Sequence, residues 1–131
     1  STQVIDNGID LSGEGGLVWL KNRTQSGGYQ HCLFDTERGA TKRLYSDATS
    51  AESTGYLSSF NNNGFTLASG FYENQSSHPH VSWTFRKQPG FFDIQTYTGS
   101  GENGQTINHD LDAVPGMVII KQTTGIYSIY L

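Results

Sequence analysis

The stretch VSWTFR, residues 81–86, places large apolar side chains at its odd positions and polar ones at its even positions. Alternation with a period of two is typical of a β-strand with one buried face and one face in water. The stretch therefore predicts a strand, and it predicts that Trp83 lies in the core.

Further apolar or alternating runs lie on both sides of this stretch. Residues 17–20 and 117–120 are continuous apolar runs, which are typical of strands covered on both faces. Shorter runs predict additional strands at residues 31–35, 56–60, 64–68, 92–97 and 127–131. Residues 44–51 have room for a short helical turn, but no long amphipathic helix is visible.

Glycine and asparagine mark reversals between these runs. Asn63-Gly64, for example, joins two short apolar runs with the residues that hairpin turns favour. Many short strands separated in this way predict an all-β fold, an antiparallel β-sandwich of jelly-roll type.

The composition limits the class of protein. The chain has 131 residues, a net charge of −4 and seven Phe, seven Tyr and two Trp, enough large side chains for one folded core. The sequence contains no basic patch and no apolar run long enough to cross a bilayer, so we expect neither nucleic-acid binding nor membrane insertion. Cys32 is the single cysteine, which leaves no intrachain disulfide.

A segment near the start of the chain recurs 100 residues later. The shared residues are Asp10, Leu11, Gly16, Val18, Lys21 and Thr24, which return as Asp110, Leu111, Gly116, Val118, Lys121 and Thr124. The repeat predicts a sandwich domain at residues 1–106 and, at 107–131, the start of a second repeat or a completing or exchanged strand. The alternative is that two unrelated strands share apolar letters and a lysine.

The second copy supplies candidates for assembly. A chain that stops inside an apolar run is expected to continue, to pair with a neighbour or to have been truncated. The residues predicted to pair across subunits are Met117, Val118, Ile119, Ile120, Tyr127 and Ile129.

No pattern in the sequence points to catalysis, a cofactor or a metal. His31 and Cys32 are adjacent, so on a strand they point to opposite faces and the histidine cannot activate the thiol. His78 and His80 flank a proline, but spacing supplies no third metal ligand. We therefore expect a non-enzymatic protein without a cofactor.

The loop at residues 70–78 favours binding. It carries aromatic side chains beside amide and carboxylate groups, which are the groups that stack on sugar rings and bond to their hydroxyls. The alternative is that the aromatics close the end of the core. The predicted glycan contacts are Phe71, Tyr72, Asn74, His78 and His80.

Nearly the whole chain resembles, in order, an uncharacterised domain family of virion proteins from marine and cyanobacterial bacteriophages. The most specific motif is FDTERGATK at residues 34–42, and the matching segments are 16–23, 31–44, 63–67, 81–87, 92–99, 107–111 and 114–121. One departure is Leu111-Asp112-Ala113, where the family pattern has a turn with glycine. The resemblance implies a jelly roll similar to concanavalin A or laminin G domains.

The resemblance also implies a function: a structural module of a tail fibre or similar appendage on the surface of the virion. Its partners would be copies of itself, as a homo-oligomer and by analogy a trimer, together with other virion proteins and a host-surface glycan. The alternatives are a lectin-like module that binds host carbohydrate, a polysaccharide depolymerase on the same sandwich, and a capsid decoration protein.

Overall fold

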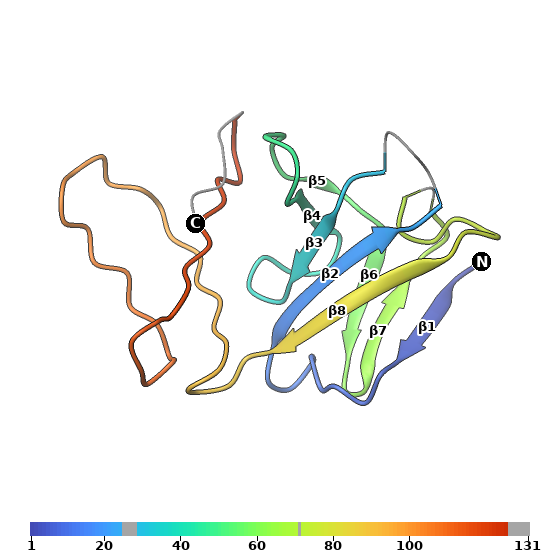
Figure 1. Cartoon of the computed structure of the whole chain (residues 1–131), viewed down its shortest axis with the longest axis horizontal. Coiled ribbons are helices and arrows are strands. Elements are labelled where there is room, and N and C mark those ends of the chain that lie inside the picture. The colour runs from blue at the N-terminus through green and yellow to red at the C-terminus, as the bar shows by residue number, and fades with distance from the viewer. Residues whose placement is uncertain (25–28, 71, 126–131) are drawn as a thin grey trace.

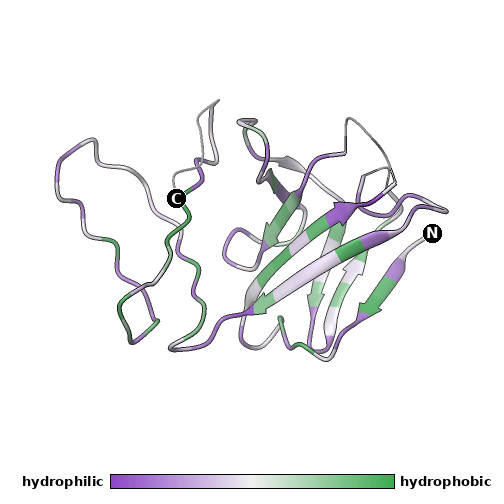
Figure 2. Cartoon of the chain, viewed as in Figure 1, coloured by the Kyte–Doolittle hydropathy of each residue, from purple (hydrophilic) through white to green (hydrophobic). Residues whose placement is uncertain are grey.

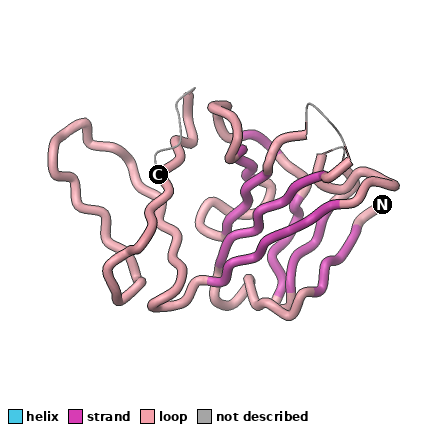
Figure 3. Tube along the Cα trace, viewed as in Figure 1, coloured by secondary structure: helices cyan, strands magenta, loops and turns pink. Residues whose placement is uncertain are grey.

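The computed structural model describes residues 1–24, 29–70 and 72–125. Within these ranges the chain contains eight strands and no helix (Figure 3). The strands are β1 (Gln3–Asp6), β2 (Gly16–Asn22), β3 (Cys32–Asp35), β4 (Lys42–Tyr45), β5 (Ser53–Thr54), β6 (Leu57–Asn61), β7 (Gly64–Leu67) and β8 (His80–Arg86). No helix of the described residues could cross a membrane.

The strands form two antiparallel sheets. One sheet has the order β1-β7-β6 and the other has the order β5-β4-β3-β2-β8 (Figure 1). The core between them is built from Val18, Leu20, Cys32, Phe34, Leu57, Phe65 and their buried neighbours. The predicted all-β antiparallel sandwich is therefore confirmed.

The strand β2, which lies between β3 and β8, shows why this sequence forms a sheet. Its side chains alternate along the strand, so that Val18, Leu20 and Asn22 are buried while Leu17, Trp19 and Lys21 are half-buried. Only one face of β2 is thus fully covered, not both faces as the continuous apolar run predicts.

The strand β8 is formed as predicted, but its aromatic face lies outside the core. Trp83 pairs with Trp19 across the sheet, and their rings meet edge to face with centroids 5.8 Å apart. The inward face of β8 is the one that holds Ser82 and Thr84, because these residues pair with the buried Leu20 and Val18. Trp83 is 45% exposed, so its predicted place in the core is wrong.

The predicted hairpin at Asn63-Gly64 is present as β6 and β7, with Asn61 opposite Gly64. The glycine is required by packing as well as by its backbone angle, since Gly64 has φ +147° and a Cβ there would lie 2.0 Å from the Ile5 carbonyl oxygen. A glycine at this position lets β1 approach β7.

The chain after β8 differs from the prediction. We name residues 88–125 the arm; it contains single bridge positions but no strand (Figure 1). The runs at 92–97 and 117–120 are therefore not strands here, because no neighbouring strand offers them a ladder. Residues 127–131, with Tyr127 and Ile129, lie outside the described residues. The helical turn expected within 44–51 is absent, since Leu44 and Tyr45 complete β4 and bends follow.

The arm is fixed to the sandwich at two places. Lys87, which follows β8, places its Nζ 3.3 Å from Asp93 Oδ1, and the Glu52 amide, just before β5, donates to the Thr123 carbonyl at 2.8 Å. Asp112, where the resembling family has a glycine turn, has φ +53°, the backbone region that glycine favours.

Candidate functional site

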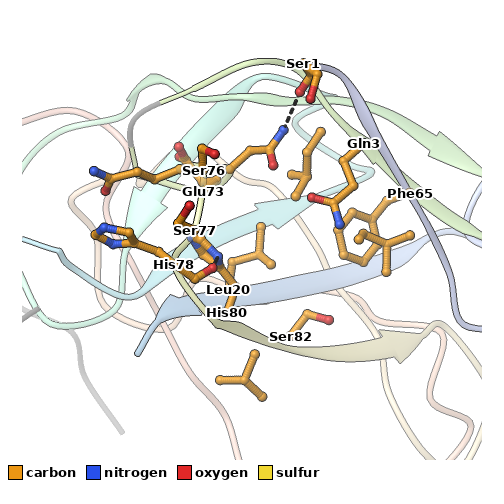
Figure 4. Close-up of a pocket in the computed structure, with 15 residues that line it drawn as sticks. Ser1, Gln3, Leu20, Phe65, Glu73, Ser76, Ser77, His78, His80 and Ser82 are labelled. Atoms are coloured by element: carbon orange, nitrogen blue, oxygen red, sulfur yellow. Dashed lines mark hydrogen bonds between the residues drawn. The ribbon is translucent and has the colours of Figure 1, made fainter. Parts of the chain in front are cut away.

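A pocket of about 500 Å³ opens on one flank of the sandwich, between β1 and β8 (Figure 4). Its floor is apolar and consists of core side chains Leu20, Phe65 and Leu67. Gln3 and Ser82 contribute to its walls from the two edge strands. Its volume falls in the range of roughly 300–1,000 Å³ that is usual for ligand sites.

The loop between β7 and β8 forms the polar side of this pocket. Glu73 anchors the loop: its side chain is fully buried, and its Oε1 accepts a bond from Arg43 Nη1 at 2.9 Å. Because Arg43 belongs to β4, the ion pair ties the loop to the five-stranded sheet. A buried pair of this kind holds its geometry because separating the charges inside the protein is costly.

The arginine has further partners that set its electrostatics. Its guanidinium lies over the rings of Tyr45 and Tyr72, at 4.8 and 5.2 Å from the centroids. Burial lowers the pKa of Arg43, but the hydrogen bond and charge of Glu73 outweigh it and raise the pKa above its ordinary value. Burial also raises the pKa of the Tyr45 hydroxyl, so both groups keep their protons.

Two buried acceptors at the pocket have no hydrogen-bond partner among the described residues. They are Glu73 Oε2 and Gln75 Oε1, and both residues line the pocket. A buried acceptor without a donor is costly, so each favours a ligand that brings a hydroxyl or amide proton.

Each of the two loop histidines has a hydrogen-bond partner for its Nδ1 atom. His78 Nδ1 lies 3.3 Å from Asn22 Nδ2, and His80 Nδ1 lies 2.8 Å from the His78 carbonyl oxygen. Figure 4 shows both histidines beside Ser77 on the loop side of the pocket. Ser77 has φ +65°, which turns the chain between Ser76 and His78.

The structure places three of the predicted glycan contacts in the lining of the pocket and a fourth beside it. Asn74, His78 and His80 line the pocket. Tyr72 instead packs on Arg43 and on the ring of Tyr29, whose centroid is 5.7 Å away, and Phe71 lies outside the described residues. Whether any of them binds a glycan stays a prediction.

Sequence reasoning missed the two orphaned acceptors, Glu73 and Gln75. Both stand in the loop that the sequence singles out, but only their burial distinguishes them. No local sequence pattern predicts that Glu73 pairs with Arg43, because the two residues are 30 positions apart.

The side chains that could act in catalysis lie apart. The Cys32 thiol lies in the core, where burial raises its pKa, whereas the ring of His31 meets Trp19 with centroids 6.0 Å apart. Across residues 1–24, 29–70 and 72–125, no three His, Cys, Asp or Glu side chains gather as metal ligands would.

The fold and the flank pocket together define a small all-β sandwich domain with a lateral, polar-walled cleft. The chain belongs to the family described as Domain of unknown function (DUF7483), whose model matches residues 2–130. The match runs through the sandwich and the arm alike. No curated protein and no solved structure matches the chain.

Proposed function

We propose that this chain is a non-enzymatic structural module of a bacteriophage appendage, such as a tail fibre, and that it assembles through contacts between like chains. The observation that carries the proposal is the apolar, strand-free arm. Eight of the eleven exposed large hydrophobic side chains in the described ranges lie on it: Phe91, Tyr97, Ile107, Val114, Met117, Val118, Ile119 and Ile120.

Apolar side chains gathered on one exposed segment mark a surface that a partner covers. Green stretches follow the arm in Figure 2, away from the sandwich. Met117 is 75% exposed and Val118 is 54% exposed, although Val118 repeats Val18, which is wholly buried in β2. Assembly would bury Val118 in a core, as Val18 is buried.

The phage part of the proposal rests on the sequence resemblance to virion proteins. It places the module on the particle surface, with copies of itself and other virion proteins as partners, and closed cyclic symmetry, such as a trimer, is the arrangement we favour. A capsid decoration protein would use the same structural role elsewhere on the particle.

Light scattering at rising protein concentration tests the assembly. We expect a mass above the 14.4 kDa of one chain, and a return to that mass in the variant Val118→Asp/Ile120→Asp. Val114→Asp is the matched control, because Val114 is 94% exposed on the same arm outside the repeated run. A single-chain mass for the unchanged protein at every concentration would contradict the proposal.

A second candidate function, binding of host-surface carbohydrate, is favoured by the orphaned acceptors in the flank pocket. Glu73 Oε2 and Gln75 Oε1 are buried acceptors without a donor in the lining of this pocket, and His78 and Asn74 also line it.

Retention on immobilised host polysaccharide tests this second function. We expect His78→Ala to abolish retention and His109→Ala, on the exposed arm, to leave it unchanged. Tyr72→Ala is a poorer test, because Tyr72 packs against Arg43 and its loss would also disturb the fold. Equal retention of the His78→Ala and His109→Ala variants would exclude the pocket as the carbohydrate-binding site.

A further inference from the structure

The flank that holds the pocket is also where both sheets end. β1 is an edge strand of the three-stranded sheet and β8 is an edge strand of the five-stranded sheet. The two strands are linked across the flank by Asn7 Nδ2, which donates to Thr84 Oγ1 at 3.0 Å. The edge at β6 differs, because the amides of Leu11 and Thr41 already bond to its carbonyls.

The free edge of β8 can be assigned residue by residue. At its two ends the β2–β8 ladder contains bonds from the Arg23 amide to the Pro79 carbonyl and from the Lys87 amide to the Gly15 carbonyl. Antiparallel ladders alternate every second residue, so the odd positions of β8 face β2. The backbone groups of Ser82 and Thr84 therefore point away from the sheet, and no partner lies on them among the described residues.

The arm contains a segment whose sequence matches that of a strand that pairs with β8. Residues 116–122 repeat β2, the strand that already pairs with β8, as GMVIIKQ against GLVWLKN. Gly16 is needed because a Cβ there would lie 2.2 Å from the Phe85 carbonyl oxygen. Gly116 repeats that glycine, yet nothing described lies within 4 Å of the place its Cβ would take.

We infer that residues 116–122 of a second copy of this chain add as a strand along the free edge of β8 and seal the flank pocket. This inference rests on the proposed assembly function and identifies the site of contact. Val118 and Ile120 face the apolar floor at Leu20, Phe65 and Leu67, while Met117 and Ile119 lie on the outer face beside Trp83. Addition of a strand to a sheet edge is an established mode of protein recognition.

The donor is a second copy because the arm of the same chain is held elsewhere. Lys121 Nζ donates to the Ala48 carbonyl at 2.6 Å, and Thr123 bonds to Glu52 beside β5. Four strand spacings separate β5 from β8, roughly 19 Å at the usual spacing. Three extended residues, from Lys121 back to Val118, span only about 10 Å.

Disulfide cross-linking between two differently labelled chains tests the contact. One chain carries Ser82→Cys and the other carries Val118→Cys or Ile120→Cys, which place the thiols on the same face. The native Cys32 does not interfere, since it is buried and burial raises its pKa. We expect a mixed disulfide with these two variants and at least tenfold less with Met117→Cys or Ile119→Cys.

A second variant covers the case in which a cysteine at position 82 prevents folding. Ser82→Lys directs a charge from the free edge into the flank, which is how natural sheets prevent edge pairing. We expect it to reduce the assembled mass to that of one chain, while Ser58→Lys on the covered edge strand β6 leaves the assembly intact.

The outcomes separate this inference from the proposed function. An assembly that persists in Ser82→Lys and gives no mixed disulfide would overturn the contact at β8 and leave assembly through the arm standing. Cross-linking only through Met117→Cys or Ile119→Cys would overturn it as well, because the strand would then face the other way. A single-chain mass for the unchanged protein would overturn both.

Discussion

Glu73 is the residue on which the position of the flank loop depends. It is one of the largest fully buried side chains, and its only charged partner in the described ranges is Arg43. A lone buried charge is far less favourable than a buried pair, so the two residues stabilise the loop only together. The arrangement also explains why the loop can present polar groups to the pocket without collapsing onto it.

Removing either partner of this pair is expected to be costly. We predict that Glu73→Ala and Arg43→Ala each lower the free energy of unfolding by about 3 kcal/mol, because each leaves the other charge buried. The double variant should lose clearly less than the sum. Urea unfolding measures this, with Glu102→Ala on the exposed arm as control; additive losses would contradict the coupling.

Asp93 holds the arm in position, as Glu73 holds the flank loop. Its carboxylate bonds to the Asp110 amide and the Gln95 side chain, and it lies 3.3 Å from Lys87 Nζ. Burial raises the pKa of Asp93, but these partners together lower it from its ordinary 3.8 to about 2. The charged form is therefore favoured in the folded protein.

This depressed pKa predicts a pH dependence. The stabilisation by Asp93, on the order of 1–2 kcal/mol, is present above pH about 4 and is lost as the pH falls through about 2. We expect the unchanged protein to melt above Asp93→Asn at pH 6 and the difference to vanish near pH 2. A melting difference that stays constant over this range would contradict the assignment.

At the scale of single strands, the sheet has two unlike faces. The inner face of the five-stranded sheet holds Phe34, which is fully buried, whereas its outer face holds Trp83, which is 45% exposed. The pair of Trp83 with Trp19 still contributes, since aromatic contacts of this type are worth about 0.5–1.5 kcal/mol.

The two faces predict different costs for losing an aromatic ring. Phe34→Ala should lower the free energy of unfolding by about 3–5 kcal/mol through the cavity it leaves. Trp83→Ala should cost less than about 2 kcal/mol in dilute protein. Denaturant unfolding below the assembly concentration compares them; equal costs would show that Trp83 lies in a core after all.

These strands also show how much of the fold can be predicted from the sequence. Alternation and turn residues predicted β2, β3, β6, β7 and β8, because a strand within a sheet needs little more than its own pattern. The same pattern failed at 117–120, since a strand also needs a neighbour. Period alone did not tell which face of β8 turns inward, and the burial of Glu73 depends on an arginine distant in sequence.

At the scale of the whole molecule, the chain contains a complete two-sheet sandwich and a segment that repeats one of its strands but pairs with no sheet. Residues 3–86 hold the eight strands of the described residues, and residues 116–122 repeat β2 without a sheet to join. Each copy therefore carries both sides of the proposed contact between copies: a free sheet edge at β8 and a segment on its arm that can pair with such an edge. Copies joined in this way would form a closed ring or a chain, depending on the angle between neighbours.

Amide hydrogen exchange of residues 117–120 tests this account most directly. We predict that these amides exchange rapidly in dilute protein and become protected at concentrations where the mass exceeds one chain. In the Val118→Asp/Ile120→Asp variant they should remain unprotected at every concentration. Rapid exchange at 117–120 in a protein that has demonstrably assembled would contradict the claim that the repeated segment is the assembly strand.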